Sequence, residues 1–178
     1  MPSTQGISTA PQRLLASHLE RLLAYHGWAY NRLLAGLEAL DADSYHAPCG
    51  LFFGSLHGTL NHLAVADRLW LARARGEPAP FTRLDAEAAS ERTTLAGFLA
   101  DGVRAWRELL SRHDDASLSQ PLAYRNMRGE AQHKPLADIV LHLVNHGSHH
   151  RGQASAALTA LGQPAPVLDY IYFLPEPA

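Results

Sequence analysis

The chain has 178 residues, a length within the usual range for one domain, and 47% of them are hydrophobic, which is enough for a sizeable core. Fifteen Lys and Arg residues stand against 17 Asp and Glu residues, so the formal net charge is -2, and no block of like charge occurs. This balance argues against a nucleic-acid binder, which needs a concentrated basic surface. We expect one domain over residues 1–178, a small molecule as its substrate, and no nucleic-acid partner.

The first twelve residues, MPSTQGISTAPQ, have neither the positive charge nor the apolar run of a secretion signal. No later stretch reaches 18 consecutive apolar residues, so we expect no membrane partner. The single cysteine, Cys49, excludes an intrachain disulfide and is typical of a reducing compartment. We therefore expect a cytoplasmic location. Cys49 has no obvious base beside it and is assigned no role.

Two helices are predicted in the first half of the chain. Apolar residues recur at helical spacing over Gln12–Leu40, with Arg and Glu between them. The segment DADSYHAPCG then supplies turn residues and a proline, so the chain should break within Asp41–Gly50. A second helix with a similar apolar stripe is predicted over roughly Ser55–Arg75.

Two further helices are predicted in the second half. The third covers roughly Glu87–His113, after the interrupting segment GEPAPFTRLD. Between Ser117 and Lys134, short alternation around a Met-Arg-Gly-Glu turn fits either a small hairpin or an irregular loop. The fourth helix begins with Pro135 in its first turn and ends near Leu161. The expected fold class is therefore all-α, a four-helix bundle with long connections.

The final segment, PVLDYIYFLPEPA, is too apolar to remain unpacked. Four of its large apolar side chains are expected to pack across one end of the bundle. They are Leu168, Ile171, Tyr172 and Phe173.

Histidine is unusually frequent in this chain, with 11 residues. One nine-residue stretch holds four of them: His142, His146, His149 and His150. Two histidines four residues apart on a helix lie on one face and can chelate one metal ion. His146 forms such a pair with His142 and another with His150. One ion cannot take all three, because residues eight apart are separated by about 12 Å along a helix. Spacing alone leaves the choice of pair open and requires a ligand from another helix.

The second predicted helix offers His57 and His62 as that ligand. They are five positions apart, so if one faces the bundle core the other points substantially away. His62 stands beside the apolar Leu63 and Leu69, whereas His57 is near the helix start, so His62 is the better interior ligand. Three imidazoles leave an open coordination position, as in catalytic sites. A histidine pair alone is common on helices, however, and a buried histidine is usually a hydrogen-bonded core residue.

Four other residues are candidates for the surroundings of the ion, and each has an ordinary structural explanation. His142 can orient a ligand, carry a proton or contact substrate, or it can be a core residue. Arg151 can anchor an anion or form a surface ion pair. Trp28 and Tyr25 can line the mouth of a pocket or pack in the core. The neighbouring His149 is expected to face outward, and His18, His46, His113 and His133 to be surface residues.

Three strings resemble the DinB-like family of metal-binding four-helix bundles, which is unrelated to the DNA polymerase of the same name. They are FFGSLHGTLNHLAVADRLWL from Phe52, LHLVNHGSHHRGQ from Leu141, and DYIYFL from Asp169. With YHGWAYNRLL from Tyr25, the resemblance covers nearly the whole chain. It implies a zinc- or nickel-like ion bound by His62, His146 and His150, which chooses between the two pairs.

Related branches of this superfamily include bacillithiol S-transferases and mycothiol-dependent maleylpyruvate isomerase. The resemblance therefore implies a metal-dependent enzyme that uses a low-molecular-weight thiol. An open coordination position on the ion would equally allow it to activate water for hydrolysis. Nothing in the sequence identifies a particular thiol or substrate. The alternative is a non-enzymatic metal-binding protein of the stress response. Long apolar helix faces often pair, so we also expect a homodimer.

Overall fold

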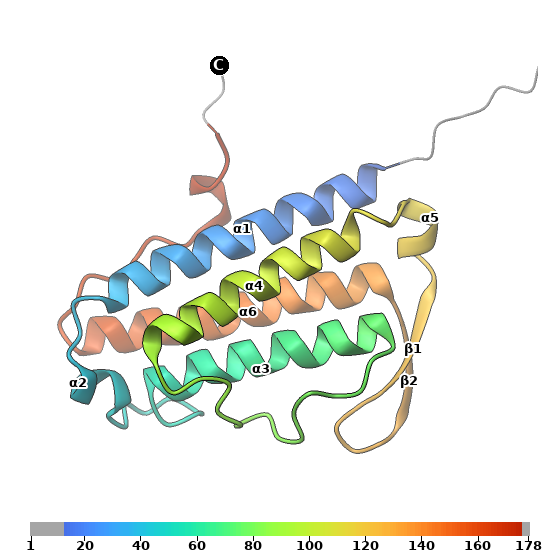
Figure 1. The fold of residues 1–178 in the computed structure, drawn as a ribbon. Helices are drawn as coiled ribbons and strands as arrows, with labels where there is room; N and C mark the ends of the chain where they lie inside the picture. Colours follow the sequence, from blue (N-terminus) through green and yellow to red (C-terminus); the bar gives the residue numbers. More distant parts are fainter. Residues whose placement is uncertain (1–12, 176–178) are drawn as a thin grey trace, which may run out of the picture.

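The computed structural model describes residues 13–175 and places four long helices together, with a short hairpin before the last one (Figure 1). The long helices are α1 (Leu14–Leu37), α3 (Leu56–Arg75), α4 (Arg92–Leu110) and α6 (Leu136–Ala160). The short elements are α2 (Ala42–His46), α5 (Asp115–Leu118), β1 (Pro121–Arg125), β2 (Ala131–Pro135) and η1 (Tyr170–Tyr172). The predicted fold class is confirmed. Gln12, the predicted first residue of the first helix, lies outside the described residues.

The core lies between the four long helices. α1 packs against α4 and α6, and α3 packs against the same two helices. Each helix contributes leucines that are at most 1% exposed: Leu33, Leu60, Leu99 and Leu158. Each such side chain stabilises the fold by roughly 1.5–3 kcal/mol relative to an exposed position. Among the helices within residues 13–175, none is both long enough and apolar enough to span a membrane.

The third long helix begins at Arg92 and not at the predicted Glu87. The buried amide of Asn61, on α3, explains the difference. Its Oδ1 accepts from the backbone N–H groups of Ala88 and Ala89, and its Nδ2 donates to the carbonyl of Ala89. These backbone groups bond to a side chain and not to a helical neighbour, so the chain stays irregular up to Glu91.

The segment before α6 is a hairpin, which decides between the two predicted alternatives. β1 and β2 are antiparallel, with Arg125 paired to Ala131. The N–H of Gly129 donates to the carbonyl of Asn126, and Gly129 has a φ of 78°, a conformation that favours glycine. Pro135 ends β2 and precedes the first helical residue, so it is a cap residue and not, as predicted, part of the first turn.

The C-terminal segment lies along the side of α1, not across one end of the bundle as predicted (Figure 1). The carbonyls of Val167 and Leu168 accept hydrogen bonds from Arg32 and from the Tyr25 hydroxyl, both on α1. Leu168, Tyr170 and Phe173 pack against the core, as expected for two of them. Ile171 and Tyr172 are 67% and 68% exposed, because the 3-10 turn directs them outward.

Candidate metal centre

Three histidines from two helices converge inside the bundle. His62 comes from α3, and His146 and His150 come from successive turns of α6. One potential ligand atom from each lies within 4.8 Å of the other two. The Nε2 atoms of His62 and His146 are 3.2 Å apart. Two nitrogens bound tetrahedrally to one zinc ion are about 3.4 Å apart, given Zn–N bonds of about 2.1 Å. This geometry suits one transition metal ion.

Hydrogen bonds to the outer ring nitrogens orient two of these histidines. Nδ1 of His62 lies 2.9 Å from the carbonyl oxygen of Leu84. A carbonyl only accepts, so Nδ1 carries the proton and the lone pair of Nε2 faces His146. Nδ1 of His150 similarly lies 2.7 Å from Oε1 of Gln153, one turn further along α6. Such outer partners fix the ring orientation in histidine metal sites.

Burial keeps the three imidazoles neutral. Phe53 stacks on His62 with the ring centroids 3.7 Å apart and also contacts His150 edge-on. Desolvation lowers the pKa of His62 to about 4 and that of His146 to about 3. It also lowers the pKa of His150. All three rings are therefore uncharged at neutral pH, which is the form that binds a metal ion.

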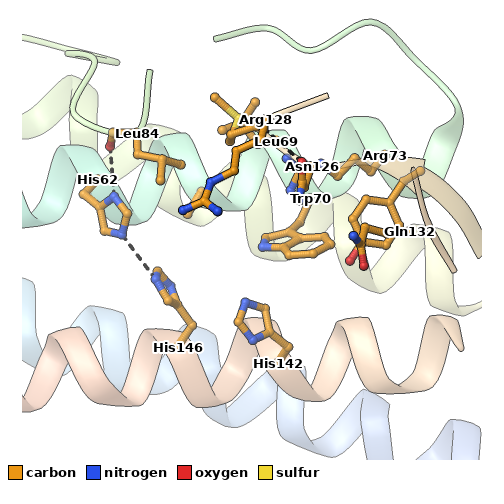
Figure 2. Close-up of a pocket in the computed structure, with 13 residues that line it drawn as sticks. His62, Leu69, Trp70, Arg73, Leu84, Asn126, Arg128, Gln132, His142 and His146 are labelled. Carbon is orange, nitrogen blue, oxygen red and sulfur yellow. Dashed lines mark hydrogen bonds between the residues drawn. The ribbon is translucent and has the colours of Figure 1, made fainter. Parts of the chain in front are cut away.

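A cavity of about 500 Å³ opens beside His62 and His146 (Figure 2). One wall is formed by α3 through Leu69, Trp70 and Arg73, and the opposite wall by α6. The hairpin and Leu84 from the α3–α4 connection complete the lining, so a molecule in the cavity would lie next to two of the three histidines. The hairpin residues are Tyr124, Asn126, Met127, Arg128 and Gln132.

His142 is the one further predicted site residue that the structure places in this cavity. It is exposed, so it is not a core residue. Its ring lies one turn before His146, with the ring centroids 5.7 Å apart, and packs edge-on against Trp70. Desolvation lowers its pKa, so the ring is neutral at pH 7 and able to accept a proton.

Arg151 lies elsewhere. It is 1% exposed and therefore not part of a surface ion pair. Its guanidinium donates to Nδ1 of His26 over 2.8 Å and to the hydroxyl of Ser148, and it borders a separate cavity beneath the C-terminal segment. The absence of a side chain at Gly147 allows this approach, because a Cβ there would be 2.3 Å from Cε1 of His26.

Tyr25 and Trp28 do not line the histidine cavity either. Tyr25 packs edge-on against Tyr170 and Phe173, and Trp28 packs against Phe173. They hold the C-terminal segment on α1, which is the packing role considered for them. His149 is exposed, as expected.

His57 is 8% exposed although it does not face the three-histidine cluster. The α3–α4 connection covers it, and its Nε2 lies 2.8 Å from a carboxylate oxygen of Glu87. Of the two candidates on α3, only His62 joins the cluster.

Several residues that contribute to the site were not predicted from the sequence. Gln153 follows His150 by three positions, and His26 continues the apolar face of α1, so the helical period contained a signal for both. The carbonyl of Leu84 and the side chain of Arg128 carried no such signal. Both come from irregular segments whose path depends on the tertiary structure.

Comparisons with known proteins agree with this architecture. The model of the DinB family matches residues 13–176. Protein DinB of Bacillus subtilis (strain 168) is 24% identical over 163 residues, which are 86% of this chain and 92% of that protein. The crystal structure of a DinB-like protein from Bacillus cereus ATCC 10987 superposes with a TM-score of 0.62 at 20% identity, covering 82% of this chain and 94% of that one.

Proposed function

This chain belongs to the DinB family, and from that premise we propose that it is a metal-dependent enzyme acting on a small-molecule substrate. His62, His146 and His150 would hold one divalent ion, zinc or nickel. A small thiol or water would serve as the nucleophile. The observation that carries the proposal is that the three-histidine cluster opens into a cavity large enough for a small molecule.

An ion held by His62, His146 and His150 would supply Lewis-acid chemistry that favours the deprotonated form of a thiol or water. The protein's own groups have separate roles. The carbonyl of Leu84 fixes the ring orientation of His62, and the side chain of Gln153 fixes that of His150. Leu69 and Trp70 give the cavity an apolar wall that limits access of water. His142 accepts the proton that the nucleophile releases.

The surroundings of the cluster favour this proposal over a purely structural metal. Structural zinc sites are usually closed by four protein ligands. Among the described residues, three side chains form the cluster. The helices that carry them are already packed by a leucine-rich core, so the fold does not need the ion to hold α3 against α6.

Metal content tests the site directly. We expect protein purified without a histidine tag to carry about one zinc or nickel ion per chain, measured by elemental analysis. His62→Ala should carry almost none, because two histidines of one helix bind an ion too weakly to retain it. The control is His149→Ala, which removes an exposed histidine next to His150. Equal metal contents in the wild type and His62→Ala would contradict the proposed site.

Activity tests the enzyme proposal. The metal-loaded protein is screened for conjugation of thiols to electrophiles and for hydrolysis of esters and amides, beside His146→Ala. We expect at least one reaction that the wild type accelerates and the variant does not. Identical rates for every substrate, together with a large fall in melting temperature on metal removal, would support the non-enzymatic alternative.

A further inference from the structure

The charged side chains that line the cavity beside His62 and His146 are all positive. The lining contains two arginines, Arg73 and Arg128, and no carboxylate among the described residues. Three acidic residues lie close in sequence to this lining, and one of them, Asp67, is buried against Gly102 of α4. Asp85 pairs with Arg83 over 2.6 Å, and Glu130 accepts a hydrogen bond from Asn126. The cavity therefore favours a ligand with negative charge.

The two arginines differ in what they contact. The guanidinium carbon of Arg73 lies 4.5 Å from the ring centre of Trp70 and 5.5 Å from that of Tyr124, so this side chain is stacked in the wall. The guanidinium of Arg128 makes no hydrogen bond or ion pair with the described residues. Figure 2 shows the Arg128 side chain extending from the hairpin toward the end of the cavity that holds His62 and His146.

The hairpin turn sets the position of Arg128. Oδ1 of Asn126 accepts from the backbone N–H groups of Arg128 and Glu130, and Gly129 closes the turn. Arg128 thus starts from a fixed backbone position, and its unpaired planar donors face a space bordered by metal-binding histidines. Arg151, predicted from sequence as an anion anchor, already donates to His26 and Ser148.

We propose that Arg128 binds the carboxylate of a substrate beside the three histidines, with the reactive group of the substrate at the histidines and its apolar body on Trp70 and Leu69. This inference rests on the proposed function and specifies its substrate class as a carboxylic acid with an apolar body. A carboxylate matches the two parallel N–H donors of one guanidinium, and one unpaired arginine balances its single charge.

Two thiols of the same chain length test the proposal, 6-mercaptohexanoate with a charged terminal group and 6-mercaptohexanol with a neutral one. Each is titrated into the cobalt-substituted protein, and the thiolate–cobalt charge-transfer absorption reports binding at the histidines. We expect the acid to bind about tenfold more tightly than the alcohol, the size of one charge-assisted hydrogen-bonded pair. In Arg128→Gln this preference should disappear through weaker binding of the acid. The control Lys134→Gln removes an exposed charge from the same hairpin and should keep the preference.

The outcomes separate this inference from the proposed function. If both thiols give the absorption band with equal midpoints, or if Arg128→Gln retains the preference, the carboxylate site is wrong while the metal site stands. If neither thiol gives a band, the proposed thiol chemistry fails. Calorimetric titration with 3-phenylpropanoate and 3-phenylpropanamide then decides the carboxylate site alone. Preference for the acid that is lost in Arg128→Gln supports it, and equal affinities overturn it.

Discussion

At the scale of single residues, the metal centre depends on a position with no side chain. Gly147 lies between the proposed ligands His146 and His150 on α6, and both His26 and Arg151 pack against its backbone. Nδ1 of His26 must accept from Arg151, because a guanidinium only donates. The buried, positively charged Arg151 and its partner His26 thus lie directly behind the turn of α6 that carries His146 and His150. A Cβ at this glycine would disturb that pair and the metal ligands together.

We expect Gly147→Ala to lower the free energy of unfolding by about 1–3 kcal/mol, the usual cost of overpacking, and to weaken metal binding. The added Cβ would lie 2.3 Å from Cε1 of His26 and 2.7 Å from a guanidinium nitrogen of Arg151. Urea denaturation and metal titration measure the two effects. The control is Gly152→Ala on the same helix, where a Cβ meets no atom within 4 Å and the substitution should stabilise by about 0.5–1 kcal/mol. Similar stabilities for the two variants would show that Gly147 is not a packing requirement.

At the scale of elements, the irregular connection between α3 and α4 is part of the site. It supplies the carbonyl of Leu84 to His62 and covers His57 through Glu87. Asn61, next to the proposed ligand His62, holds this connection by its hydrogen bonds to Ala88 and Ala89. One turn of α3 therefore carries both a ligand and the residue that secures that ligand's outer hydrogen bond.

Truncation of Asn61 should weaken metal binding although no ligand is changed. We expect Asn61→Ala to raise the metal dissociation constant by about tenfold, the usual effect of disturbing an outer partner of a metal ligand. The comparison is Asn145→Ala, which removes an exposed amide next to His146. Competition with a chromophoric chelator measures both constants. Unchanged affinity in Asn61→Ala would mean that Leu84 is positioned independently of Asn61.

At the scale of the whole molecule, the features that could be predicted from the sequence were those in which residues recur at regular spacing. The helical recurrence of apolar residues predicted four long helices, and the doubled histidine pair on α6 predicted a metal-binding face. The resemblance selected the same three histidines that the fold brings within 4.8 Å. Contacts made across loops were not readable. The role of Arg128 depends on how the hairpin meets α3, and the burial of His57 and Arg151 depends on segments distant in sequence.

A buried carboxylate on the α4-facing side of α3 gives the whole fold a distinctive pH dependence. Asp67 is 3% exposed, and burial raises its pKa from 3.8 to about 7, an effect that nearby Arg68 only partly offsets. Since the folded state holds the proton more tightly, its stabilising contribution is complete below about pH 4 and is lost as the pH rises to about 7. The size of this loss is on the order of 4 kcal/mol.

Asp67→Asn keeps the shape of the side chain and removes its titration, so the stability of the wild type relative to this variant should fall between pH 4 and pH 7 and then level off. Using the difference cancels the opposite contribution of His62 and His146, whose lowered pKa values destabilise both proteins as the pH falls below about 6.5. Urea denaturation of the metal-free proteins at several pH values gives the measurement. Asp101→Asn, at an exposed site on α4, should show no such trend against the wild type. A pH-independent difference for Asp67→Asn would mean that burial does not raise the pKa of this carboxyl in the folded protein.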